Sequence, residues 1–385
     1  MATSQLHTGN GATDTRNGGQ TSADESLAGK MNGFHHPATN GHALLRAPLE
    51  LTGLLDKFQS FDVTPVIGTE FPNVQLTDWL RAPNSDELLR ELAITISQRG
   101  VAFFRAQDGL NDDLQKELGQ RLGELAGKPK TSGLHIHPLI NFENEDGAQD
   151  RSINIISTNK AKKPAEDITK TYHTRKGGNL LGWHTDISYE PVPSDYTLLR
   201  LTELPSSGGG IVSALQDPKT PYQQFLETLT ANYAQSRYPQ TAKEKNFEIY
   251  SQPRGAPENT GAALSTVHPV IRTNPVTGWK TVYAIGNHVK GINGLTETES
   301  THLIDWFTRL IVENHDLQVR NRWQNPNDVD LDAAIWDNRA AYHTATFDFE
   351  GLGPRTGHRV VGLGEKPYLD PNSMSKREYL AQRHG

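Results

Sequence analysis

Residues 182–189 of the chain are Gly182-Trp183-His184-Thr185-Asp186-Ile187-Ser188-Tyr189. The pattern is typical of a β-strand, in which successive side chains alternate between two faces. We therefore predict that His184 and Asp186 project together. An imidazole and a carboxylate side by side can hold a divalent metal, but a stable site needs a third ligand. We predict that ligand at His343, which closes the stretch Trp336-Asp337-Asn338-Arg339-Ala340-Ala341-Tyr342-His343.

Two histidines and one carboxylate on one face of an ion are the ligands typical of non-haem Fe(II) oxygenases. A His-x-Asp pair alone is weak evidence, because the chain has 15 histidines. Two arginines add to it: Arg355 and Arg359 follow His343 by twelve and sixteen positions, at the start of a predicted strand over 355–363. At period two they share a face, and a guanidinium pairs with carboxylates through a bidentate fork. A cosubstrate with two carboxylates could bind iron at one end and an arginine at the other.

Composition excludes several other classes of protein. The chain has 385 residues, 35% of them hydrophobic, which is enough for one large domain or two small ones. It has no cysteine, so it forms no disulfide and has no thiolate ligand. With a net charge of −7 and no block of basic residues, we expect no nucleic-acid partner. No apolar run suits a membrane and no signal peptide is evident, so we expect a cytoplasmic protein.

The chain divides into a tail and one folded domain. Residues 1–45 are rich in Gly, Ser, Thr, Asn and His, and they have too few large apolar side chains to offset the entropy of ordering. We predict a disordered tail over 1–45 and a folded domain over 46–385. The domain should be mainly β with flanking helices, a sandwich or jelly roll.

Apolar periodicity places the elements of this domain. Helices are predicted from Asn84-Ser85 to Arg99, from about Asp112 to Leu125, from Thr220-Pro221, and after the capping box at Thr296. Strands are predicted over 101–105, 134–140, 196–201 and 211–215, with a hairpin over 268–283. Residues 141–178 are predicted to form a long loop, either a lid or a solvated insertion.

The predicted strand over 134–140 carries His135 and His137 on one face. One interpretation is a pair of surface or capped histidines. The other is that one of them lines a substrate pocket. Spacing alone leaves both open.

Several stretches together resemble the taurine dioxygenase-like (TauD/TfdA) family of Fe(II)/2-oxoglutarate oxygenases, including its fungal sulfonate dioxygenase branch. The resemblance covers about residues 60–370. It rests on Leu134-His135-Ile136-His137-Pro138, Gly182 to Asp186, Leu204 to Gly209, His268-Pro269-Val270, Gly278, and Trp336-Asp337-Asn338-Arg339 with His343, Arg355 and Arg359. It implies a double-stranded β-helix, or jelly roll, that forms a dioxygenase domain over 46–385.

The resemblance also implies roles for individual residues. His184, Asp186 and His343 would bind Fe(II), with 2-oxoglutarate as cosubstrate and O2 as oxidant. Arg355 would pair with the far carboxylate of 2-oxoglutarate, and Arg359 would face the anionic group of the primary substrate. His137 would be a pocket residue. No catalytic residue is expected beyond the metal centre, and Asp337 and Asn338 would shape the strand before His343.

Two positions depart from the family pattern. Where the family has a threonine that helps to hold 2-oxoglutarate, this chain has Ile211, so one hydrogen bond worth about 0.5–1.5 kcal/mol would be missing. Where family members have a tyrosine that contacts taurine, this chain has Ile140. Both changes make the expected pocket more apolar.

We therefore expect an oxygenase that oxidises a C–H bond of a small anionic molecule. The favoured substrate is an aliphatic amino acid such as valine, hydroxylated or oxidatively cyclised in secondary metabolism. The first alternative is a taurine or alkylsulfonate dioxygenase for sulfur scavenging. Further alternatives are an inactive jelly-roll binding protein, which the lost threonine favours, and a metal-dependent hydrolase. The sequence leaves a homo-oligomer open.

Overall fold

The computed structural model describes residues 46–139, 142–143, 149–157, 182–203, 210–214, 221–246, 248–323, 331–345 and 353–384. The predicted tail, residues 1–45, and Ile140 lie outside these ranges. Arg46–Gly385 form one compact unit. Within the described ranges, no helix combines the length and apolar character needed to cross a membrane.

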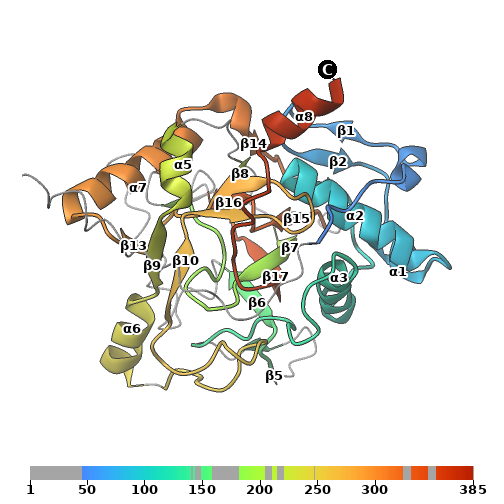
Figure 1. The fold of residues 1–385 in the computed structure, drawn as a ribbon. Helices are drawn as coiled ribbons and strands as arrows, with labels where there is room; N and C mark the ends of the chain where they lie inside the picture. The colour runs from blue at the N-terminus through green and yellow to red at the C-terminus, as the bar shows by residue number, and fades with distance from the viewer. Residues whose placement is uncertain are drawn as a thin grey trace, which may run out of the picture. The chain divides into compact units, whose positions relative to one another are not determined.

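A seven-stranded sheet forms the centre of this unit, in the order β1-β2-β3-β15-β7-β17-β6 (Figure 1). Its strands are β1 (Phe61–Asp62), β2 (Thr69–Phe71), β3 (Val101–Phe104), β6 (Ile153–Ser157), β7 (Ser194–Glu203), β15 (Ala333–Asp337) and β17 (Thr356–Leu363). All neighbours in it are antiparallel except β2 and β3. The strands predicted over 101–105, 196–201 and 355–363 are therefore confirmed. Part of the predicted loop over 141–178 is instead strand β6, because Ile153 and Ile155 are buried where β6 pairs with β17.

Smaller sheets complete the β structure. Strand β8 (Gly210–Ala214) lies between β14 (Gln318–Arg320) and β16 (Ala341–Ala345), and β9 (Thr230–Ala234) lies between β10 (Ser265–Pro269) and β13 (Val289–Ile292). The predicted hairpin is present as β11 (Ile271–Thr273) paired with β12 (Lys280–Val282). A short pair joins β4 (Phe142–Glu143) to β5 (Gln149–Asp150).

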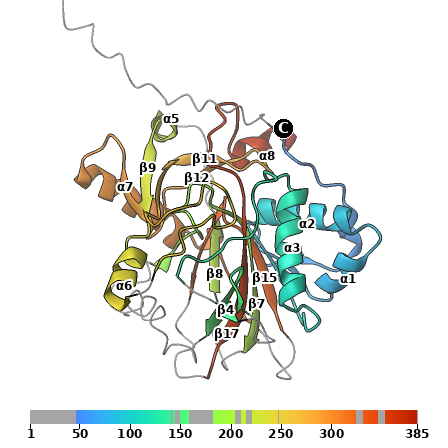
Figure 2. The ribbon, with the colours of Figure 1, turned by 90° about the horizontal axis from the view of Figure 1, so that it is seen from below.

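Strand β7 shows how the layers pack, because its side chains are buried on both faces. On one face, Tyr196 and Leu198 share an apolar cluster with α1 (Leu76–Arg81), α2 (Ser85–Arg99) and α3 (Asp112–Leu125). On the other face, Leu199 and Leu201 share a cluster with residues of β14 and β16. Figure 2 shows α2 and α3 on one side of β7 and β15. The sheet of β14, β8 and β16 therefore packs on the face of β7 opposite the helices. Thr197 lies on that same face of β7.

The described helices mostly follow the predicted bounds. Helix α2 begins at Ser85 and ends at Arg99, and it is followed by Gly100, whose φ of 77° favours glycine. The side chain of Asn84, just before the helix, makes no capping hydrogen bond. Helix α7 (Glu297–Val312) begins with the predicted capping box of Thr296 and Glu299. The remaining helices are α5 (Pro221–Glu227), α6 (Arg237–Lys245), α8 (Lys376–His384) and the short 3-10 turns η1 (Leu54–Lys57) and η4 (His315–Leu317).

Candidate metal centre

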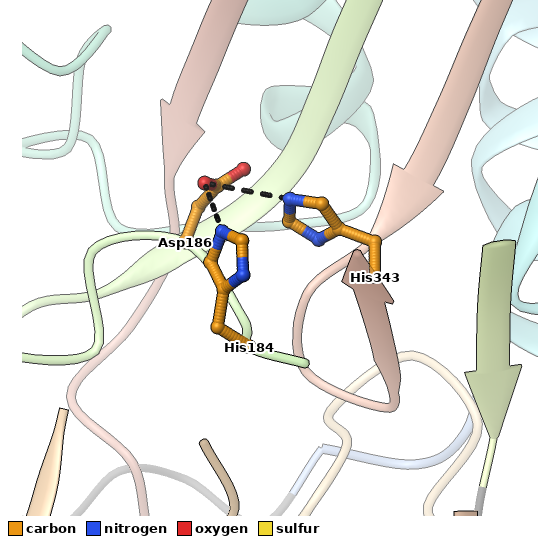
Figure 3. Close-up of side chains that lie close together, drawn as sticks. All are labelled: His184, Asp186 and His343. Atoms are coloured by element: carbon orange, nitrogen blue, oxygen red, sulfur yellow. Dashed lines mark ion pairs between the residues drawn. The ribbon is translucent and has the colours of Figure 1, made fainter. Parts of the chain in front are cut away.

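Three side chains from two distant parts of the sequence meet in one cluster (Figure 3). The Nε2 atoms of His184 and His343 lie 3.9 Å and 3.8 Å from Oδ1 of Asp186. The three candidate ligand atoms all lie within 4.8 Å of one another. These separations let a single ion contact all three groups.

Backbone pairing brings the two histidines together. The amide of His184 donates to the carbonyl of His343 (3.0 Å) and the amide of His343 donates back (2.9 Å), so the two residues form an isolated antiparallel bridge. Their rings stand 4.3 Å apart between centroids. His343 lies in β16, whose neighbour β8 fixes its register.

The predicted strand over 182–189 is wrong beyond this bridge. The chain turns directly after Thr185, and Ile187 adopts a φ of 60°. The turn is closed by the amide of Glu190, which donates to the carbonyl of Ile187 (3.0 Å). Asp186 therefore reaches the histidines from a turn held by side-chain hydrogen bonds, and not from the alternation of a strand.

The hydrogen bond at Nδ1 of His184 determines which ring nitrogen of this residue can face a metal. Nδ1 lies 2.9 Å from the carbonyl oxygen of Gly182. Because a carbonyl only accepts, Nδ1 carries the proton and Nε2 presents its lone pair to the cluster. A backbone carbonyl behind a metal-binding imidazole is the usual arrangement. The Nδ1 of His343 is buried with no hydrogen-bond partner among the described residues, and its ring lies 4.7 Å from that of Trp336.

Nearby charges keep the Asp186 carboxylate ionised, and burial above all keeps the His343 imidazole neutral. Burial alone would raise the pKa of Asp186, but Arg359, His343 and His184 outweigh it and lower that pKa below its ordinary value. Burial, and then the neighbouring His184, lower the pKa of His343 to about 3. These are the protonation states in which both groups can bind a metal.

The two predicted arginines lie in different places relative to the cluster. Arg359 is in β17, and its guanidinium donates to Oδ1 of Asp186 at 2.9 Å. Its Nε is buried without a hydrogen-bond partner among the described residues. Arg355 precedes β17 by one residue, and burial lowers its pKa. The contact of Arg359 with the candidate ligand Asp186 was not predicted from the sequence.

The predicted strand over 134–140 is also mostly wrong, because among the described residues 134–139 only Leu134 forms a bridge, to Gly362 of β17. The interpretation of His135 and His137 as surface residues is wrong as well, since they are 5% and 8% exposed. The backbone amide of Leu139 donates to Nδ1 of His137 (3.1 Å). The Nε2 atom of His137 lies 3.3 Å from the Tyr238 hydroxyl. Burial, and then the charge of Arg359, lower the pKa of His137 to about 3, so its ring is neutral.

Of the two positions that depart from the family pattern, one lies among the described residues. Ile211 lies in β8, paired with Arg320 of β14 and Thr344 of β16. Ile140 falls outside the described residues.

Sequence reasoning missed the groups that hold Asp186. The Thr197 hydroxyl donates to its Oδ2 (3.0 Å), the Asn338 side-chain oxygen accepts from its amide (3.1 Å), and the Ser194 hydroxyl donates to its carbonyl (2.5 Å). All three partners are buried. Asn338 lies within a stretch that the sequence did single out, but Thr197 and Ser194 carry no sequence signal of their own.

Comparison with known proteins shows the family of this chain. The family described as "Taurine catabolism dioxygenase TauD, TfdA family" matches residues 59–361. The alpha-ketoglutarate-dependent dioxygenase btcD of Neocamarosporium betae is 51% identical over 355 residues, 87% of this chain and 99% of that protein. The alpha-ketoglutarate-dependent dioxygenase esdpJ of Penicillium shearii is 49% identical over 372 residues, 88% of this chain and 97% of that protein.

One more distant relative and one solved structure are also similar to this chain. The alpha-ketoglutarate-dependent sulfonate dioxygenase of Saccharomyces cerevisiae is 30% identical over 324 residues, which cover 82% of this chain and 69% of that protein. A crystal structure of a putative alpha-ketoglutarate-dependent taurine dioxygenase from Burkholderia xenovorans superimposes with a TM-score of 0.57 at 22% identity, over 82% of this chain and 93% of that one. At this identity the superposition supports the fold alone.

Fold, ligand set and relatives together define an Fe(II)- and 2-oxoglutarate-dependent dioxygenase, an enzyme that uses O2 as its oxidant. The chain belongs to the TauD/TfdA family. The alternatives of an inactive binding protein and of a hydrolase are set aside.

Proposed function

We propose that His184 and His343, through Nε2, and Asp186, through Oδ1, hold the Fe(II) ion of this dioxygenase. The observation that carries the proposal is the convergence of these three atoms within 4.8 Å. Two imidazoles and one carboxylate form the facial triad that non-haem Fe(II) oxygenases use. Bound iron would supply the oxidising chemistry: as 2-oxoglutarate loses CO2, one oxygen atom of O2 would end in succinate, and the other would enter a substrate C–H bond or, in a cyclisation, leave as water with two substrate hydrogens.

The protein's part is to bind and orient the reactants. Arg355 is proposed to pair with the far carboxylate of 2-oxoglutarate, beside Ile211, which lacks the hydroxyl that the family places there. Arg359 is proposed to hold the anionic group of the substrate. The buried Nε of Arg359 has no hydrogen-bond partner among the described residues, and a terminal nitrogen of its guanidinium donates to Asp186. An anion bound at Nε would therefore lie next to the candidate metal ligand Asp186. His137 and Ile140 are proposed to line the same pocket.

The proposed substrate is a small aliphatic acid, with an amino acid such as valine favoured, oxidised by hydroxylation or oxidative cyclisation in secondary metabolism. Ile140 and Ile211 support an apolar pocket. The relatives near 50% identity are named dioxygenases without a sulfonate substrate, whereas the sulfonate dioxygenase is 30% identical. A taurine or alkylsulfonate dioxygenase is the alternative, supported by that same relative.

The proposal includes a jelly-roll core, which the two facing sheets and the Burkholderia xenovorans structure support. It also includes a single catalytic domain over 46–385 in the cytoplasm. Its partners are small molecules, and neither nucleic acid nor a membrane is expected to bind.

The test is succinate release from 2-oxoglutarate under air with Fe(II), using a panel of aliphatic amino acids and alkylsulfonates. Release should be stimulated most by an aliphatic amino acid, and Asp186→Ala should abolish it. Asp186→Ala should remain folded by circular dichroism. Turnover at the wild-type rate in that variant would reject the metal site. Stimulation by taurine alone would select the alternative.

A further inference from the structure

We propose that Thr197, oriented by Asn338, is a positioning residue that determines which oxygen of Asp186 binds the metal. The inference rests on the proposed metal site and adds two residues to it. Neither residue touches the candidate ligand atoms of the histidines. Each acts through the Asp186 carboxylate.

The two hydrogen-bond partners of the Thr197 hydroxyl fix the direction of its proton. The side-chain amide nitrogen of Asn338 donates to Thr197 Oγ1 at 2.8 Å. Thr197 Oγ1 lies 3.0 Å from Oδ2 of Asp186. A hydroxyl has one proton to donate. Because its oxygen accepts from the amide and the ionised carboxylate can only accept, that proton points at Oδ2.

The orientation of the Asn338 amide is fixed by its other partners. Its Oδ1 accepts from Nε1 of Trp336 (3.1 Å) and from the backbone amide of Asp186 (3.1 Å). Its Nδ2 also donates to the backbone carbonyl of Asp195 (3.1 Å). The two N–H groups can only donate and the carbonyl can only accept, so a flipped amide would lose all three bonds.

The Thr197 hydrogen bond has a consequence for the Asp186 carboxylate. Oδ2 accepts from Thr197, on the side away from the histidines' candidate ligand atoms. Oδ1 accepts from Arg359 at 2.9 Å and is the oxygen that lies 3.9 Å and 3.8 Å from the two imidazole nitrogens. The metal would therefore meet one oxygen of Asp186, and Thr197 prevents the carboxylate from rotating to offer both. Thr197 is 0% exposed and pairs with Trp336 between β7 and β15, so a rigid sheet holds the hydroxyl in place.

The test compares Thr197→Val, which keeps the shape and removes the proton donor, with Thr197→Ser, which restores it. Co(II) is titrated into the full-length chain by calorimetry, and the visible absorption of bound Co(II) reports its coordination. Partners in the second shell of a metal typically contribute about 10- to 100-fold in affinity. We expect Thr197→Val to weaken Co(II) binding by that factor and to change the spectrum, and Thr197→Ser to recover both.

Thr202→Val is the matched control, because Thr202 lies on the same strand and its hydroxyl bonds to the carbonyl of Thr356. It should bind Co(II) like the wild type. If Thr197→Val does not fold, Asn338→Asp, which no longer donates to Thr197, should show the same loss.

Wild-type affinity and spectrum in Thr197→Val would overturn the positioning role while leaving the metal site intact. A wild-type chain that binds Co(II) no better than Asp186→Ala would overturn both proposals.

Discussion

The buried ion pair between Glu190 and Arg254 gives a stability prediction with a magnitude. Arg254 Nε and Nη2 lie 2.5 Å and 2.9 Å from the two carboxylate oxygens of Glu190, and the side chains are 0% and 1% exposed. The other terminal nitrogen of Arg254 donates to the carbonyls of Tyr250 and Gly261, at 2.8 Å each. The pair therefore fixes the 250–261 segment against the turn that follows Asp186.

Removing one charge should be more harmful than removing both. Arg254→Met leaves a buried carboxylate without its charge partner, at a cost of about 3–5 kcal/mol. Glu190→Leu leaves the buried guanidinium without its partner, at a similar cost. In the double variant no charge is buried, and the remaining loss is the two carbonyl contacts, at about 0.5–1.5 kcal/mol each. The double variant should then lie about 1–3 kcal/mol below the wild type, and above both single variants.

The assay is urea unfolding followed by tryptophan fluorescence, with a chelator present so that metal binding does not contribute. The control is the exposed pair of Arg81 and Glu117, which lies 3.5 Å apart with side chains 63% and 35% exposed. Arg81→Met should change the unfolding free energy by less than about 1 kcal/mol. The reasoning is refuted if Arg254→Met is as stable as Arg81→Met, or if the double variant is less stable than either single one.

Three further variants test other parts of the molecule. Burial, and then Arg272, lower the pKa of His268 from 6.5 to about 3, so the unfolded chain binds a proton that the folded chain does not, and stability should fall as pH drops from 6.5 toward 3. His268→Gln should flatten this slope in urea midpoints, and an unchanged slope would contradict it. A Cβ on Gly286, where φ is 101°, would lie 2.8 Å from the carbonyl oxygen of Trp183 and 3.0 Å from Cα of His184. Gly286→Ala should therefore weaken Co(II) binding. The control Gly261→Ala, where φ is 78° and a Cβ would have no atom within 4 Å, should bind Co(II) like the wild type. Equal Co(II) affinities of the two variants would refute the expected clash at Gly286. Arg355→Ala should raise the half-saturating 2-oxoglutarate concentration in the succinate assay by more than about 100-fold, which corresponds to about 3–5 kcal/mol, and an unchanged requirement would assign the role to another residue.

Local patterns in the sequence were sufficient for several of the regular elements. Helix α3 spans the predicted residues 112–125, and α7 begins at its capping box, because apolar periodicity and caps are properties of adjacent residues. The buried strand β3 was likewise evident from its apolar run and from Gly100 before it.

The site was predicted as a set of residues but not in its geometry. His184 and His343 do meet, yet through an isolated bridge, and Asp186 reaches them from a turn with a positive φ at Ile187. A β-branched residue with positive φ is rare, so the pattern favoured a strand. The contact between Thr197 and Asn338 joins residues 141 positions apart, and nothing in either local sequence indicates it.

A crystal structure grown anaerobically with Fe(II) and 2-oxoglutarate would show whether one ion is held by His184, Asp186 and His343. We expect one anomalous iron peak at bonding distance, about 2.0–2.3 Å, from both Nε2 atoms and from a single oxygen of Asp186. An iron peak elsewhere in the domain, or one bound without Asp186, would refute this metal site.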